Sequence, residues 1–143
     1  MHKYKDIGFA LTPQRIAILE YLDGNKGHPS ADEIYKAILG TLPTMSLATV
    51  YTTLAALNKR GKLRMLTIDP EKRRYDPDIA DHSHMICISC KRIIDLDGDA
   101  HYALPEALVK DFSVLTCSIE LTGLCPNCKQ QERASTEEDQ YVR

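Results

Sequence analysis

Two pairs of cysteines, each with two residues between them, constrain the second half of this 143-residue chain. The pairs are Cys87 with Cys90 and Cys125 with Cys128. Two thiolates from one tight turn can bind one metal ion, and two such turns supply the four sulfurs of a closed tetrahedral zinc site. The stretch between the pairs has room for a strand, a helix and another strand, so zinc would join both ends of a small α+β unit. The alternatives are two disulfides or four reduced thiols, and the paired spacing favours zinc.

Charge is divided unevenly along the chain. Residues 1–76 carry twelve Lys or Arg against eight Asp or Glu, whereas residues 77–143 carry six against twelve. A basic first half suits a polyanion, and an acidic second half suits cations. Without a bilayer-length apolar run or a signal-like start, the chain is expected to be cytoplasmic and away from membranes. Thiols stay reduced there, which favours metal over disulfides, and the fifth cysteine, Cys117, is expected to be buried in an apolar strand.

Three helices are expected in the first half, because N-cap residues and glycines bracket three amphipathic stretches. In the second of them Ile34, Ala37 and Ile38 are expected to face inward. A short helix before these three is also indicated. The expected ranges are residues 3–10, 13–23, 31–39 and 47–60.

The third of the capped helices has an outer face suited to DNA. Hydroxyl groups and a tyrosine can bond phosphates or base edges, and basic residues grip the backbone. A solvated helix face is the alternative, and the next segment of the chain argues against it: residues 62–69 and 74–76 are expected to form a hairpin, with a turn at 70–73. Three helices followed by a basic hairpin indicate a winged helix-turn-helix. The expected DNA contacts are Ser46, Thr49, Tyr51, Thr52, Thr53, Lys59, Arg60, Lys72 and Arg73.

A second cluster of metal-binding residue types follows the hairpin. His82 and His84 alternate along an extended segment and therefore point the same way. Asp76 precedes them and Asp95 lies on the next expected strand, with Asp97 nearby. Nitrogen and oxygen donors without sulfur suit Fe²⁺, Mn²⁺ or Zn²⁺. The alternative is that the two histidines are a solvated surface pair. They lie at the start of a strand that leads into a cysteine turn, and this position favours a role as metal ligands.

The expected fold is α+β, with an N-terminal winged helix-turn-helix domain and a small C-terminal α/β dimerisation domain around the four-cysteine zinc site. Strands are expected over 92–97 and 113–124, with a helix over 105–111, and their short apolar faces need a second subunit to cover them. The tail is expected to fray. The expected boundaries are 1–76 for DNA binding, 77–81 for the hinge, 82–128 for dimerisation and metal sensing, and 129–143 for the polar tail.

Taken together, the motifs resemble those of the ferric uptake regulator family, most closely its peroxide-sensing branch. The stretches that carry the resemblance are LTPQR at 11–15, HPSADEIY at 28–35, SLATVYTTL at 46–54, RRYD at 73–76, DHSHMICISC at 81–90, RIIDL at 92–96 and CPNC at 125–128. The resemblance implies a homodimeric repressor that binds palindromic, AT-rich operator DNA. It assigns the four paired cysteines to structural Zn²⁺.

The same resemblance implies a regulatory site for Fe²⁺ or Mn²⁺. Its ligands are His28, Asp76, His82, His84 and Asp95. In this branch Asp stands at two positions where iron-sensing members often carry Glu, and peroxide is implied to oxidise His28 or His82 when Fe²⁺ is bound. Metal would then leave and release the operator.

Three other interpretations stay open. One is a plain iron- or manganese-responsive repressor without peroxide sensing, and another is a further metal site that uses Asp97 and His101. The third is a hydrolase or oxygenase built on His82 and His84. The sequence lacks the H-x-E, H-E-x-x-H and Gly-rich phosphate-loop patterns of such enzymes, so no enzyme and no organic cofactor are expected.

Overall fold

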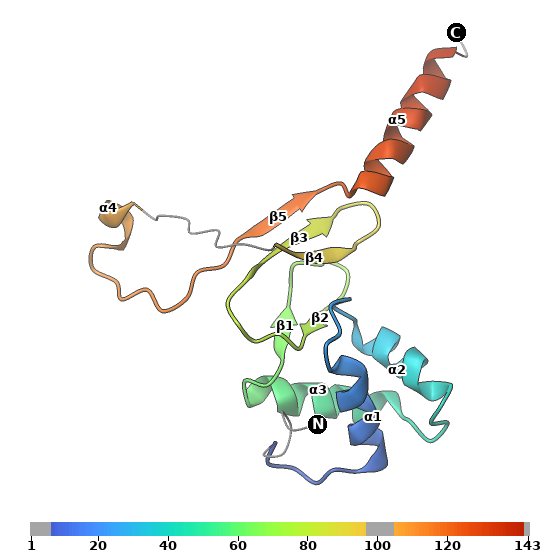
Figure 1. Cartoon of the computed structure of the whole chain (residues 1–143), viewed down its shortest axis with the longest axis vertical. Coiled ribbons are helices and arrows are strands. Elements are labelled where there is room, and N and C mark those ends of the chain that lie inside the picture. The colour runs from blue at the N-terminus through green and yellow to red at the C-terminus, as the bar shows by residue number, and fades with distance from the viewer. Residues whose placement is uncertain (1–6, 97–104, 142–143) are drawn as a thin grey trace. The chain divides into compact units, whose positions relative to one another are not determined.

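The computed structural model describes residues 7–96 and 105–141, with side chains up to residue 136. The chain divides into two compact units, residues 1–80 and residues 81–143, which are described one at a time. Figure 1 labels their helices and strands. Asp97 and His101, the candidates for a further metal site, lie outside the described residues. Within the described ranges, no helix has the length and apolar character needed to cross a membrane.

Unit 1 begins with three helices, α1 (Pro13–Leu22), α2 (Ala31–Leu39) and α3 (Leu47–Lys59). Each starts where the sequence predicted, because a hydroxyl side chain accepts a hydrogen bond from the first turn: Thr12, Ser30 and Ser46 are the N-caps. In α2 the Glu33 carboxylate also accepts from the Ser30 N–H at 2.7 Å, which completes a capping box. Residues 7–10 form no helix, so that part of the short first helix was wrongly predicted.

The three helices share one apolar core. Ala37 was expected to lie in it and is exposed, while Ala31 is buried beside Ile34 and Ile38. The reason is helical geometry: at about 100° per residue, Ala31 and Ile38 lie on one side of Ile34 and Ala37 on the other. The buried cluster consists of Ile7, Ile18, Leu19, Leu22, Ala31, Ile34, Ile38, Met45, Val50, Leu54, Leu57, Leu63 and Tyr75.

A short hairpin follows α3. Strands β1 (Arg64–Leu66) and β2 (Arg74–Asp76) pair antiparallel, with Arg64 opposite Asp76. The first strand is shorter than the predicted 62–69, because the chain leaves the strand after Leu66 and turns back before β2. Within this turn the Asp69 carboxylate accepts from the Glu71 N–H at 2.9 Å. The hairpin is the expected wing, and the Tyr75 N–H ties it to the Pro29 carbonyl at 3.0 Å.

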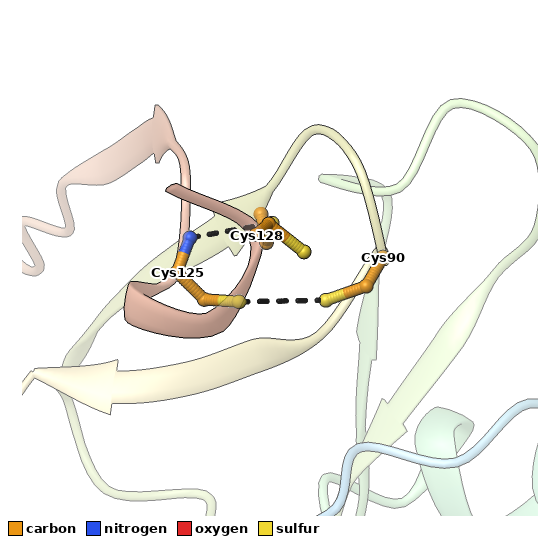
Figure 2. Close-up of side chains that lie close together, drawn as sticks. Cys90, Cys125 and Cys128 are labelled. Atoms are coloured by element: carbon orange, nitrogen blue, oxygen red, sulfur yellow. Dashed lines mark hydrogen bonds between the residues drawn. The ribbon is translucent and has the colours of Figure 1, made fainter. Parts of the chain in front are cut away.

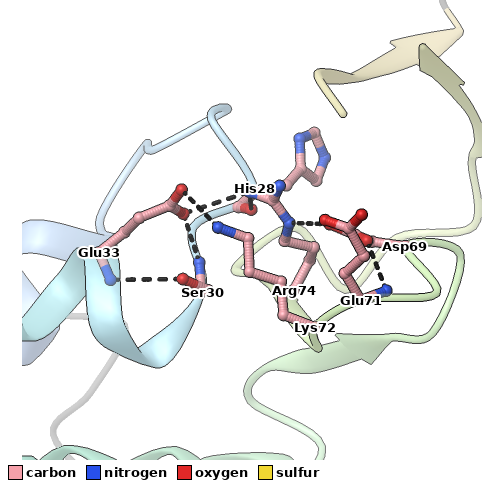
Figure 3. Close-up of polar contacts among 7 residues, drawn as sticks. All are labelled: His28, Ser30, Glu33, Asp69, Glu71, Lys72 and Arg74. Atoms are coloured by element: carbon pink, nitrogen blue, oxygen red, sulfur yellow. Dashed lines mark hydrogen bonds and ion pairs between the residues drawn. The ribbon is translucent and has the colours of Figure 1, made fainter. Parts of the chain in front are cut away.

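An ion cluster, in which Asp69 and Arg74 are buried and Glu33 is half-exposed, joins the wing to the start of α2. The Arg74 guanidinium lies between two carboxylates, with Nε 2.9 Å from Asp69 and Nη1 3.2 Å from Glu33 (Figure 3). Burial raises the pKa of Asp69, but the Glu71 N–H and the Arg74 guanidinium outweigh it and leave the pKa lowered. For Glu33, burial is likewise outweighed by the Ser30 N–H and the Lys72 and Arg74 cations, so its pKa is also lowered. The cluster therefore stabilises both carboxylates in their charged form.

Unit 2 holds a three-stranded sheet in the order β4-β3-β5. Strand β3 (Ser83–Cys87) pairs antiparallel with β4 (Ile93–Leu96) and parallel with β5 (Glu120–Gly123), and helix α4 (Glu106–Val109) lies in the connection between β4 and β5. The predicted strand over 113–124 pairs only over its last part. The tail forms helix α5 (Pro126–Tyr141) instead of fraying, because Pro suits a first helical position and the Lys, Gln, Glu, Arg and Ala after it favour helix.

We expect the Asp69→Asn substitution to destabilise unit 1 by about 3 kcal/mol, because it leaves a buried guanidinium without its closest anion. The lowered pKa means that the carboxylate stabilises the fold above its unfolded pKa and loses this effect as pH falls. The difference from wild type should therefore shrink below about pH 4. Urea unfolding followed by amide exchange in peptides from residues 13–59 measures both effects. The control is Glu71→Gln, which changes an exposed side chain of the same turn. An equal loss of stability in both variants would contradict the role given to the Asp69–Arg74 pair.

Candidate metal centres and nucleic-acid interface

The four paired cysteines come together in unit 2. Strand β3 ends at Cys87, the following turn carries Cys90, and Cys125 and Cys128 lie at the start of α5. Their sulfur atoms all lie within 4.8 Å of one another. The Sγ atoms of Cys90 and Cys125 are 3.8 Å apart (Figure 2). The Cys125 N–H donates to Cys87 Sγ at 3.3 Å. This is a closed set of four soft donors, the arrangement of a structural zinc site.

Backbone groups prepare this cluster for a cation. The Cys125 N–H, with further N–H groups of the Cys90 turn, lowers the pKa of Cys87 to about 6. The Cys128 N–H lowers the pKa of Cys125. For Cys128 the hydrogen bond with Ser89 lowers the pKa, but the neighbouring Cys125 thiol and burial outweigh it and raise the value to about 11. The sulfurs thus differ in how readily they lose a proton, and a central cation would favour the thiolate form of all four.

The predicted N/O donors of unit 1 form a buried pair. His28 lies in the loop before α2 and Asp76 ends β2, and the two side chains are 1% and 3% exposed. His28 Nε2 is 3.6 Å from Asp76 Oδ2, and Asp76 Oδ1 accepts from the Asp78 N–H at 2.8 Å. His28 adopts a φ of 49°, a left-handed conformation that is uncommon for residues other than glycine. Only the resemblance pointed to His28, because the loop-to-strand pairing that buries it is not visible in the sequence.

The predicted N/O donors of unit 2 form a second group. His84 lies in β3, His82 directly before it, and Asp95 opposite His84 on β4. One carboxylate oxygen, Asp95 Oδ1, is 3.2 Å from His82 Nε2 and 3.5 Å from His84 Nε2. The two rings lie on the same face, as their alternation predicted, with centroids 4.4 Å apart. Two imidazoles and a carboxylate converging in this way suit a divalent cation with N/O preference.

A groove lies between α3 and the wing of unit 1. Its volume is about 720 Å³, and Tyr51, Lys59, Lys72 and Arg73, four of the predicted DNA contacts, line it. Three of these are basic, whereas Asp32 and Glu71 are the acidic residues of the lining. The groove also includes Ala55, Asn58, Met65 and Tyr75, whose place there depends on the hairpin folding back and could not be read from the sequence.

The other predicted DNA contacts lie on or beside α3 outside the groove lining. Thr53 was wrongly placed on the outer face: it is 1% exposed, and its hydroxyl donates to the Thr49 carbonyl at 2.7 Å. Ser46 caps the helix through the Thr49 N–H, and Thr52 is exposed. Arg60 donates to the Gly8 carbonyl at 3.2 Å and lies over the Phe9 ring, which fixes the start of the described chain.

Comparison with known proteins assigns the family. Residues 6–122 match the ferric uptake regulator family. The chain is 41% identical over 134 residues to the peroxide operon regulator of Bacillus subtilis, covering 90% of each chain. The chain belongs to the ferric uptake regulator family.

Solved structures of the ferric uptake regulator family have the same fold. A peroxide stress regulator from Campylobacter jejuni is 32% identical, with a TM-score of 0.66 over 81% of this chain and 89% of that one. A ferric uptake regulator from Francisella tularensis, described with iron, is 27% identical, with a TM-score of 0.76 over 87% of this chain and 98% of that one. These relatives are regulators, in agreement with the expectation that this family member is not an enzyme.

Cys117 provides a matched control for the sulfur cluster of this family member. It was expected to be buried and is exposed, because the segment that contains it lies before β5 and is not part of the sheet. We expect Cys125→Ser to abolish zinc retention and amide-exchange protection in β3, β4 and β5, because structural zinc contributes on the order of 10 kcal/mol to folding. Cys117→Ser should change neither.

Zinc content by elemental analysis and exchange by mass spectrometry measure the two effects. Full zinc retention and unchanged protection in Cys125→Ser would show that the cluster does not hold the metal.

Proposed function

We propose that this protein is a metal-dependent, DNA-binding repressor that responds to hydrogen peroxide. The observations that carry the proposal are the buried His28–Asp76 pair of unit 1 and the group of His82, His84 and Asp95 in unit 2. Neither contains sulfur, and the chain also has a separate closed sulfur set. The two sets suit two metals of different character. The identity to a peroxide operon regulator supports peroxide as the signal, and the cytoplasm is the compartment in which such a regulator meets DNA.

The two sets have different tasks in this proposal. Cys87, Cys90, Cys125 and Cys128 hold structural Zn²⁺ and keep unit 2 folded. His28 and Asp76 of unit 1, with His82, His84 and Asp95 of unit 2, hold Fe²⁺ or Mn²⁺. Because its ligands belong to two units joined at a hinge, binding of this cation favours the arrangement of the units that fits the operator. By linkage, operator DNA must then raise the affinity for the cation by the same factor.

Peroxide ends repression by changing a ligand. Bound Fe²⁺ supplies the reduction of peroxide that generates an oxidant beside the imidazoles, whereas Mn²⁺ resists this reaction. His28 and His82 are the candidate targets. An oxidised ring is a poor ligand, so the cation leaves and the units are no longer held in the operator-binding arrangement.

We expect peroxide to add oxygen to His28 or His82 in the Fe²⁺ form and not in the Mn²⁺ form. The tryptic peptide of residues 27–36 contains His28 and no Met or Cys, so an added oxygen there points to His28 with little ambiguity. The peptide of residues 75–91 contains His82 but also Met85 and two cysteines, so fragmentation must locate the change. DNA release should follow the modified fraction.

The outcome also decides the second candidate function. A repressor that responds to iron or manganese alone would keep both peptides unmodified and would remain on DNA after peroxide, while losing DNA when the cation is removed by a chelator. That result would contradict peroxide sensing and retain metal dependence.

The DNA surface in this proposal is the groove between α3 and the wing. Lys59, Lys72 and Arg73 neutralise phosphates, while Tyr51 on the exposed side of α3 reaches base edges or phosphates. The operator is proposed to be double-stranded, palindromic and AT-rich, which matches a two-fold homodimer.

Dimerisation is proposed through unit 2. Large apolar side chains are exposed on strands β4 and β5 and on the segment before β5. They are Ile94, Leu108, Phe112, Val114, Leu115 and Leu121. Phe112 and Leu115 are 80% and 90% exposed, and a second copy of the unit would remove such a surface from water.

We expect Lys59→Gln and Arg73→Gln each to lower the salt dependence of operator binding, reducing the slope of log K against log salt concentration by about 1. The measurement is a fluorescence-anisotropy titration of the Mn²⁺-loaded protein on a duplex selected from a random pool. Lys26→Gln removes an exposed positive charge outside the groove lining and should leave the slope close to wild type. If Lys59→Gln and Arg73→Gln both kept the wild-type slope, as the control should, the DNA would bind outside this groove.

A further inference from the structure

The ion cluster of unit 1 contacts a residue that the proposed function uses as a metal ligand. Arg74 Nη1, which pairs with Glu33, also donates to the carbonyl oxygen of His28 at 3.4 Å. Its Nε pairs with Asp69 on the other side, so three acceptors from separate segments hold one guanidinium (Figure 3). A planar guanidinium with fixed donor directions transmits this constraint better than a flexible ammonium would.

The backbone of His28 needs such support. A left-handed conformation costs a residue other than glycine on the order of 1–2 kcal/mol, so surrounding contacts must maintain it. Two hydrogen bonds from β2 reach this loop, from the Arg74 side chain to the His28 carbonyl and from the Tyr75 N–H to the Pro29 carbonyl. Asp76, the partner of His28, follows these two residues directly in β2. The strand that carries one ligand therefore also fixes the backbone of the other.

We propose that Arg74, held by Glu33 and Asp69, is a positioning residue that orients His28 toward Asp76 before the regulatory cation binds. The inference rests on the proposed function, because it assumes that these two side chains share the cation. A ligand pair that is already arranged loses less conformational freedom on binding, so its affinity for the cation is higher. Groups that hold a ligand in place typically alter metal affinity by 10–100-fold when they are removed.

Glu33→Gln isolates this effect from folding. Gln at the third helical position can still accept from the Ser30 N–H, so the capping box of α2 is kept, while the charge that holds Arg74 is lost. The double variant Asp69→Asn/Arg74→Gln removes the guanidinium and its closest buried anion together, which avoids leaving either charge unpaired. Glu20→Gln changes an exposed carboxylate on α1 in the same chemical way and is the matched control.

The test is the dissociation constant for Mn²⁺, measured by titration calorimetry on the full-length, zinc-loaded protein without DNA. We expect the dissociation constant for Mn²⁺ to rise roughly threefold in Glu33→Gln and by about 10-fold or more in the double variant. The control should bind as wild type does. The urea midpoint of Glu33→Gln should fall far less than that of Asp69→Asn, because the Glu33 side chain is 43% exposed. A small fall in midpoint with a clear loss of affinity separates lost positioning from lost structure.

Wild-type Mn²⁺ affinity in both Glu33→Gln and the double variant would overturn this inference and leave the proposed function standing. If the double variant unfolds, Glu33→Gln decides alone, and unchanged affinity in it overturns the inference. A wild-type protein with no exchangeable Mn²⁺ would instead overturn the proposed function and this inference with it.

Discussion

Unit 2 depends on four sulfur atoms that a single cation must hold together. Its sheet has three strands of four or five residues, and several of its large apolar side chains are exposed. A sheet of this size buries too little apolar surface to be stable on its own. The four cysteines lie at or just after the end of β3 and at the start of α5. Bonds from their sulfurs to one cation would therefore connect two segments that are far apart in the sequence. Because the sulfurs are committed to this task, the His and Asp donors remain available for a cation that can exchange.

In unit 1 the wing hairpin places a proposed metal ligand and a residue of the proposed DNA groove on one strand. Side chains alternate along β2, so Arg74 and Asp76 share one face and Tyr75 has the other. Asp76 pairs with His28, while Tyr75 lines the groove between α3 and the wing. In the proposed function, a change at Asp76 therefore reaches the proposed DNA surface through the neighbouring residue of the same strand. This coupling lies within one unit and adds to any rearrangement of the two units.

The features that the sequence predicted are those fixed by local chemistry. Each helix start follows from an N-cap residue whose side chain bonds to the backbone within the next four residues. The two cysteine turns and the His82–His84 alternation are equally local. The helical tail was not predicted, because its polar composition is typical of a frayed terminus, whereas the helix propensity of its residues favours a helix. Thr53 and Cys117 were misplaced because the identity of a residue does not report which face the neighbouring elements cover. The Glu33–Arg74 pair spans 41 positions, and no local pattern reveals it.

The central claim is that imidazoles from both units bind one exchangeable cation. Pulsed electron paramagnetic resonance of the Mn²⁺-loaded, zinc-replete protein counts the nitrogen nuclei coupled to the metal. The account predicts three coupled imidazole nitrogens in the wild type and two in a His28→Ala variant that still binds Mn²⁺ through unit 2. Two nitrogens in the wild type, unchanged by His28→Ala, would contradict it, because unit 1 would then contribute no imidazole to the ion.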